Sequence, residues 1–146
     1  MSKIVLLDAG PLGRVSNPKA TTINRECFAW MESMIVSGVQ VFVPEIADYE
    51  VRRELIRANK TQGIARLDII KNTIGYIPIT TPIMMKAAEL WGEARRSGIP
   101  TADPKELDCD VILAAQALEC GGIIATENIG HLTRFVAAEH WCDIKP

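Results

Sequence analysis

The chain has 146 residues, of which 48% are hydrophobic and 23% charged, as expected for one globular domain with its own core. Its formal net charge of −2 excludes a global attraction for nucleic acid, so an RNA site would need a local basic patch. No stretch has the roughly 20 consecutive apolar residues of a membrane span, and the N-terminus lacks the form of a signal peptide. We therefore expect a single cytoplasmic domain over residues 1–146, without a membrane partner.

The four cysteines indicate reduced thiols rather than a metal site or a disulfide framework. None of them forms a C-x-x-C pair, and no histidines stand at a matching spacing, so a structural zinc site is not expected. They are Cys27, Cys109, Cys120 and Cys142. Free thiols are the usual state of cysteine in the cytoplasm.

Strand-like and helix-like segments alternate along the chain. Short continuous apolar runs are typical of strands buried on both faces, and apolar residues repeated every three or four positions are typical of helices. The first half predicts a strand at 3–7, a break at Gly10 and Pro11, a polar loop at 15–20, a helix at 22–37, a strand at 39–43 and a helix at 44–58 opened by Pro44. The second half predicts helices at 61–74 and 81–96 around a strand at 76–79, a polar loop at 99–105, a helix at 111–118, a strand at 123–125, a short helix at 129–135 and an edge strand at 141–144.

This alternation predicts an α/β fold. About five short strands would form a mostly parallel sheet, with helices covering both faces in a three-layer α/β/α arrangement. Ligands of such sheets bind outside the carboxyl ends of the strands. Polar residues placed at strand ends are therefore the first candidates for a functional site.

Four such residues follow strand-like runs or begin the adjoining helices. Asp8 ends the first run, Glu50 lies in the helix after the second, Asp110 starts the helix at 111–118, and Asn128 follows the strand at 123–125. Clustered carboxylates raise each other's pKa unless a cation balances their charge. Mg²⁺ prefers such oxygen ligands, and a bound ion can activate water for phosphodiester hydrolysis.

Each acid also has a purely structural interpretation. Asp8 could set a turn before Gly-Pro, and Glu50 could pair with Arg53 or Arg57 on a helix surface. Asp108 and Asp110 could cap a helix and interact with its dipole. The hypothesis of a functional site therefore depends on the coordinated placement of these residues.

The order of these motifs resembles the PIN-domain family, specifically the small bacterial VapC-type toxins. A strand ends in Leu6-Leu7-Asp8, and Pro44-Glu45-Ile46-Ala47-Asp48-Tyr49-Glu50 follows a second strand. Asp110 precedes an apolar run with Ala114 and Ala115, and a later strand ends in Thr126-Glu127-Asn128. The resemblance covers almost the whole chain.

The resemblance implies a PIN-like fold and a Mg²⁺- or Mn²⁺-dependent endoribonuclease, the toxin of a type II toxin–antitoxin pair. It implies that Asp8, Glu50 and Asp110 bind the metal. Asn128 matches a fourth position that is often Asp in the family, and Thr126 matches a residue that supports the first aspartate. Asp108 competes with Asp110 for the third acidic position, and we prefer Asp110 because it lies next to the Ala-Ala run.

The implied partners are RNA, a cognate antitoxin protein and a second copy of the chain. RNA phosphates would need cations, for which the candidates are Arg14, Arg52, Arg53, Arg57 and Lys60, together with Arg95 and Arg96. His131 is expected to pack or to hydrogen-bond within its loop. A surface for a partner or a second copy is expected around Ile83, Met84, Leu90 and Trp91, although ordinary core packing would explain the same pattern.

Two other functions are compatible with parts of the pattern. A PIN-fold module that binds RNA or protein with weak or no cleavage would explain Asn128 and the negative net charge. A phosphatase or phosphotransfer receiver would use Asp8, but no Asp-x-Asp follows the first strand and no lysine stands near a late strand end.

Overall fold

The computed structural model describes residues 3–98, 104–130 and 132–146. Its strands are β1 (Ile4–Leu7), β2 (Gln40–Pro44), β3 (Tyr76–Ile77), β4 (Ile123–Thr126) and β5 (Ala138–His140). Its α-helices are α1 (Ala9–Ser16), α2 (Thr22–Val36), α3 (Glu45–Arg57), α4 (Thr61–Ile74), α5 (Thr81–Arg96) and α6 (Pro104–Cys120). Two short 3₁₀ helices, η1 (Leu132–Arg134) and η2 (Trp141–Asp143), lie near the C-terminus. The described residues include no helix long and apolar enough to cross a membrane.

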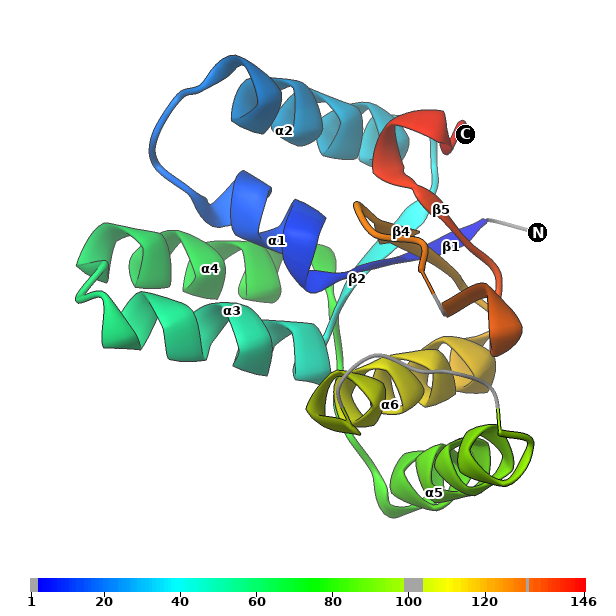
Figure 1. Ribbon diagram of the computed structural model, residues 1–146. Coiled ribbons are helices and arrows are strands. Elements are labelled where there is room, and N and C mark those ends of the chain that lie inside the picture. Colours follow the sequence, from blue (N-terminus) through cyan, green and yellow to red (C-terminus); the bar gives the residue numbers. More distant parts are fainter. Residues whose placement is uncertain (1–2, 99–103, 131) are drawn as a thin grey trace.

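The strands form one five-stranded sheet in the order β3-β2-β1-β4-β5. All neighbouring pairs are parallel, and central Leu6 lies in register with Phe42 on one side and Ile124 on the other. Helices lie on both sides of the sheet (Figure 1). The predicted three-layer α/β/α fold is confirmed. Because every strand is parallel, the carboxyl ends of β1, β2 and β4 share one edge.

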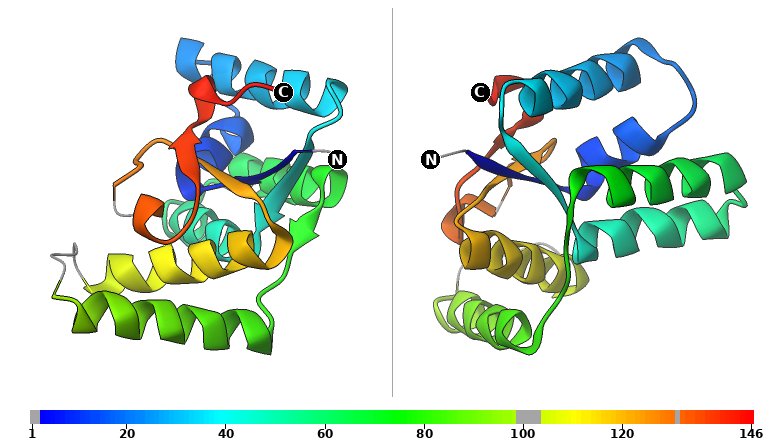
Figure 2. Two further views of the ribbon diagram at one scale, coloured as in Figure 1. Left: turned by 90° about the vertical axis from the view of Figure 1, so that its right-hand side faces the viewer. Right: turned by 180° about the vertical axis from the view of Figure 1, so that it is seen from behind.

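The two faces of the sheet are covered by different helices. Val5 and Leu7 of β1 pack with residues of α1, α2 and α4 in one apolar cluster, whereas Leu6 packs with Leu113 and Ala117 of α6 on the other face. This alternation follows from the two-residue period of a strand. Helix α5 lies outside α6 and packs against it (Figure 2).

Helix α1 occupies a segment in which the sequence predicted a break and the start of a loop. Asp8 is its N-cap, with extended backbone and a side chain that accepts a hydrogen bond from the N–H of Ala9. Gly10 and Pro11 suggested a chain break, but they lie in the first turn, where proline is tolerated because its absent N–H would have no helical partner. The predicted break at Gly10 and Pro11 is therefore wrong, and so is the predicted loop at residues 15 and 16.

The C-terminal half also differs from the prediction in its boundaries. Helix α6 begins at Pro104 rather than at 111, so Asp108 and Asp110 lie within the helix and do not cap it. The edge strand β5 precedes the predicted one, and residues 141–143 form η2 instead. Pro44 is the last residue of β2 and the N-cap of α3, not its first helical residue.

Only two of the four apolar residues on α5 that were predicted to face a partner are exposed. Ile83 and Leu90 are buried in the cluster that joins α5 to α6. Met84 and Trp91 remain 46% and 38% exposed. Core packing thus explains half of this set, and the exposed half forms part of the outer surface of α5.

Candidate active site

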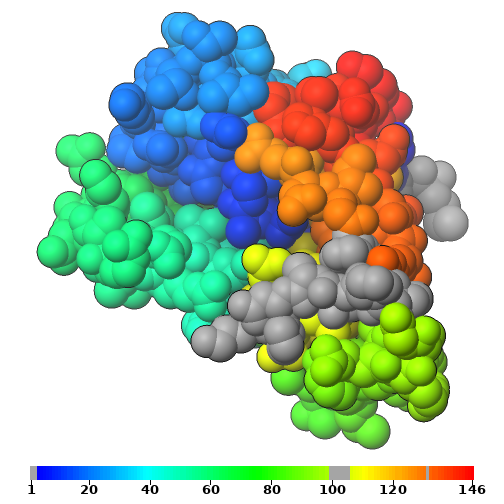
Figure 3. Space-filling view, in the orientation of Figure 1, coloured from blue at the N-terminus to red at the C-terminus, as the bar shows by residue number. Residues whose placement is uncertain are grey.

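A cavity of about 460 Å³ lies at the carboxyl edge of the sheet. Its lining includes Asp8 after β1, Glu50 of α3, Asp110 of α6 and Asn128 after β4. In the space-filling view the start of α1, the start of α6 and the segment after β4 meet on one surface (Figure 3). The chain therefore brings the sequence-predicted acids and the amide to a single site.

Both carboxylate oxygens of Asp8 are held by the protein. Oδ1 accepts a hydrogen bond from the N–H of Ala9 at 2.7 Å, and Oδ2 accepts one from the hydroxyl of Thr126 at 2.8 Å. Thr126 is buried, and its Oγ1 also accepts a bond from the N–H of Asn128 at 3.0 Å. Thr126 thus fixes Asp8 relative to the segment that carries Asn128.

Glu50 is positioned by the anchoring of α3. Buried Gln116 of α6 accepts a hydrogen bond from the N–H of Ile46 at 3.3 Å and donates one to the carbonyl of Ile77 at 2.7 Å. These bonds tie the first turn of α3 to α6 and β3. Gln116 was not among the predicted site residues. An amide inside the apolar Ala-Ala-Gln-Ala run was nevertheless a visible signal, since a buried amide requires hydrogen-bond partners.

The clustered acids are difficult to ionise. Burial, followed by repulsion from Asp8, raises the pKa of Glu50 to about 7, and the Arg53 guanidinium opposes this shift. Burial and the same repulsion raise the pKa of Asp110 to about 6. Burial also raises the pKa of Asp8 against the two hydrogen bonds that favour its charged form. Near neutral pH the site therefore carries incompletely compensated negative charge.

This donor set fits a hard divalent cation. Carboxylates of Asp8, Glu50 and Asp110 line one cavity, and a cation would offset the burial of their charges and the repulsion from Asp8 that acts on Glu50 and Asp110. No group of three or more His, Cys, Asp or Glu side chains in the described part of the chain forms a ready-made cage for an ion. Mg²⁺ needs no such cage, since it usually keeps several waters and takes one or two carboxylates together with substrate phosphates.

The structure distinguishes Asp110 from Asp108. Asp110 lines the cavity, whereas Asp108 is exposed and does not. Two further titratable side chains line the cavity and were not predicted as part of the site, Glu106 and Cys109. Burial and the charge of Glu50 raise the pKa of the Cys109 thiol to about 11, so this cysteine is a neutral wall residue at physiological pH.

Most of the predicted RNA-contacting cations have partners within the protein. Arg14 donates to Glu127 at 2.5 Å, Arg52 pairs with Asp48 and Asp68, and Arg57 pairs with Glu54. Arg53 lies over the Tyr49 ring at 5.0 Å and lines the acidic cavity. Lys60 lines a second, adjoining cavity. His131 lies outside the described residues.

The pH dependence of stability provides a test of this electrostatic arrangement. Without divalent metal, the free energy of unfolding should fall as pH rises from about 4.5 to 7, because folding raises the pKa of Glu50 and the folded state then binds more protons than the unfolded state. We expect a fall of about 1–2 kcal/mol after allowance for solvent screening. Urea unfolding in chelator would measure it.

Glu50→Gln should reduce this dependence, chiefly above about pH 6, because the amide does not titrate; the raised pKa of Asp110, about 6, accounts for the dependence that remains at lower pH. Glu54→Gln is the matched control, since Glu54 lies one turn later on the same helix and pairs with Arg57 at the surface. An equal slope in wild type and Glu50→Gln would contradict the assignment of the shift to this carboxyl group.

The sequence matches no protein-family model and no curated protein sequence, but the fold has clear structural counterparts. The chain is similar to VapBC2 from Rickettsia felis, solved with a promoter DNA fragment, with a TM-score of 0.73 and 18% identity over 94% of this chain and 98% of that one. It is similar to FitAcB from Neisseria gonorrhoeae, with a TM-score of 0.70 and 20% identity over 96% of this chain and 99% of that one. It is also similar to VapC20 from Mycobacterium tuberculosis, described as a sarcin–ricin loop cleaving toxin. The TM-score is 0.66, with 12% identity over 97% of this chain and 99% of that one.

These counterparts define the class of fold. The chain has the three-layer architecture of the VapC-type PIN-domain proteins over nearly its whole length. In this chain the carboxyl edge of the sheet carries Asp8, Glu50 and Asp110, the positions that the sequence motifs had indicated.

Proposed function

We propose that this protein is a divalent-metal-dependent endoribonuclease of the VapC type, the toxin of a toxin–antitoxin pair. The observation that carries the proposal is the convergence of Asp8, Glu50 and Asp110 in one cavity. Burial raises the pKa of all three, and repulsion from Asp8 raises those of Glu50 and Asp110 further. The likeness in fold to a toxin described as cleaving the sarcin–ricin loop supports RNA as the substrate class.

In this proposal Asp8, Glu50 and Asp110 hold Mg²⁺ or Mn²⁺. When bound, such an ion supplies Lewis-acid polarisation of the phosphodiester and lowers the pKa of a water. Thr126 keeps the Asp8 carboxylate in one orientation through the hydrogen bond to Oδ2. Asn128 contributes a neutral amide to the rim, so its position adds no charge to the acids of the cavity. Arg53 on the cavity wall provides a cation for the phosphate.

The proposed protein partners are a cognate antitoxin and a second copy of the chain. Several of the structural counterparts were solved as toxin–antitoxin complexes, including VapBC2 and FitAcB, which supports an antitoxin for this chain. The exposed Met84, Met85 and Trp91 on α5 support a homodimer, because exposed apolar side chains that gather on one helix favour association.

RNA cleavage by the purified chain tests the proposed function. Mixed-sequence single-stranded RNA should be cut in Mg²⁺ or Mn²⁺ and should remain intact in chelator, with cleavage products resolved on a denaturing gel. The melting temperature should rise with either metal, since an ion that binds only the folded state adds about 2.7 kcal/mol at a hundred times its Kd.

Two outcomes would count against the nuclease. A metal-dependent rise in melting temperature without cleavage of any RNA would favour a PIN-fold binding module. An unchanged melting temperature at millimolar metal would contradict the metal site itself.

A further inference from the structure

A second and larger cavity, of about 880 Å³, lies beside the acidic one. It runs between α1 with the loop that follows it and the end of α3 with the start of α4. We call it the α1–α4 groove and define it by Gly13, Asn17, Lys19, Glu50, Leu55 and Lys60. Its volume falls within the range of about 300–1,000 Å³ that is typical of ligand sites.

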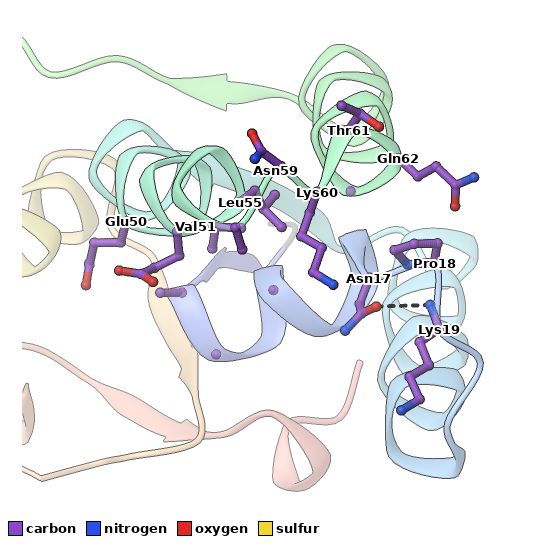
Figure 4. Close-up of a pocket in the computed structure, with 16 residues that line it drawn as sticks. Asn17, Pro18, Lys19, Glu50, Val51, Leu55, Asn59, Lys60, Thr61 and Gln62 are labelled. Atoms are coloured by element: carbon purple, nitrogen blue, oxygen red, sulfur yellow. Dashed lines mark hydrogen bonds between the residues drawn. The ribbon is translucent and has the colours of Figure 1, made fainter.

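The groove adjoins the acidic site. Ala9 and Glu50 line both cavities, so a ligand at that end of the groove would lie next to the carboxylates. Glu50 lies at one end of the groove, and Lys19 and the α1–α2 loop lie at the other (Figure 4). Lys60 extends from the start of α4 toward Asn17 (Figure 4).

The groove has the chemistry that a nucleotide strand requires. Lys19 and Lys60 are exposed, and neither ammonium group has an ion pair or hydrogen bond among the described residues. The acid Glu54 also lines the groove, but it is paired with Arg57 at 2.8 Å. The two lysines are therefore available to phosphate, in contrast to Arg14 and Arg52.

Amide side chains gather at the lysine end of the groove, and apolar side chains lie nearer to Glu50 (Figure 4). The side chains of Asn17, Asn59 and Gln62 offer donors and acceptors, and Val51 and Leu55 supply apolar surface. Amide side chains can hydrogen-bond base edges, apolar contacts accommodate bases and riboses, and lysines bind the backbone phosphates.

We propose that the α1–α4 groove binds the segment of single-stranded RNA that flanks the scissile phosphate on one side, with Lys19 and Lys60 bound to its backbone. This inference rests on the proposed nuclease function and adds the path of the substrate to it. It also selects Lys19, which the sequence analysis did not consider, and separates Lys60 from the arginines that are engaged in the fold.

A steric test uses Gly13, which lines the groove on α1. A Cβ atom at Gly13 would meet no atom outside its own stretch of helix within 4 Å, so a side chain can begin there without a clash and would take up space in the groove. Gly13→Leu should raise the Kd for RNA about tenfold, as loss of a stacked or apolar contact of one nucleotide does. Gly92→Leu on α5 is the matched control, since Gly92 has equal space and lies away from the groove; its Kd should stay within about twofold.

A charge test uses the two lysines. Lys19→Ala/Lys60→Ala should weaken binding and reduce the slope of log K against log salt by about 1.4, because each single-strand phosphate contact contributes about 0.7. Lys71→Ala/Lys86→Ala removes the same net charge from other surfaces and should leave the slope unchanged. The probe is a fluorescein-labelled, randomised single-stranded RNA of about eight nucleotides. Its binding is measured by fluorescence anisotropy with Ca²⁺ in place of Mg²⁺, and its integrity is checked on a gel.

The outcomes separate this inference from the proposed function. If the wild type cuts RNA but the groove variants bind it like their controls, the groove is not the RNA path and the inference fails alone, which leaves the groove to a protein partner. If the wild type neither binds nor cuts RNA, the proposed function fails and the inference fails with it. Weaker binding in both groove variants, with unchanged controls, is the expected result.

Discussion

Asp8→Asn is expected to abolish metal-dependent RNA cleavage, lowering the rate by at least about a hundredfold. Loss of a residue that only supports a metal ligand already costs about 10–100-fold, and Asp8 is proposed as a ligand itself. The amide preserves the shape of the side chain and a partner for Thr126, but it removes one negative charge from the cavity. Single-turnover cleavage in Mn²⁺ would measure the effect.

The fold should survive this substitution. Burial raises the pKa of Asp8, so its charge is unfavourable in the metal-free protein, and the neutral variant should melt at the same temperature or slightly above it in chelator. Asp108→Asn is the matched control, because it removes the same charge from α6 at an exposed position outside the cavity. Equal cleavage by Asp8→Asn and wild type would contradict the proposed role of Asp8.

The sheet and most helices could be predicted because their signals are local. The run at 3–7 and the helical spacing at 61–74 correspond closely to β1 and α4, since each is apolar on the faces that the core covers. Helix α1 could not be predicted from its own residues. Gly10 and Pro11 favour a turn, and the helix exists because Asp8 caps it and because Leu12 and Val15 are buried in the core.

The candidate site also has features that could be predicted from the sequence and features that could not. The approach of Asp8 and Asp110 could be predicted, since Asp8 ends a strand and Asp110 was expected at the start of an adjoining helix, at the same edge of a parallel sheet. Asp110 lines the cavity although α6 begins earlier, at Pro104. The pairing of the arginines with acids inside the protein could not be predicted. Arg14 pairs with Glu127 more than a hundred residues away, and such a partner is visible only after the chain has folded. The availability of Lys19 and Lys60 has the same tertiary origin.

Gln116→Leu is expected to destabilise the fold by about 2–5 kcal/mol, a large part of the stability of a small domain. The side chain is fully buried, and leucine fills a similar volume but offers no hydrogen bonds. The N–H of Ile46 and the carbonyl of Ile77 would lose the amide that binds them, and each unsatisfied buried group costs about 1–3 kcal/mol. Urea unfolding monitored by far-UV circular dichroism would measure the loss.

The same change should also affect catalysis in the fraction that remains folded. Gln116 anchors the first turn of α3, the helix that carries Glu50, so loosening it should lower the affinity for metal as well as the stability. Gln40→Leu is the control at an exposed position of β2 and should change the free energy of unfolding by no more than about 0.5 kcal/mol. A Gln116→Leu variant as stable as this control would show that water or a backbone shift satisfies both groups, and that α3 is held by its apolar contacts alone.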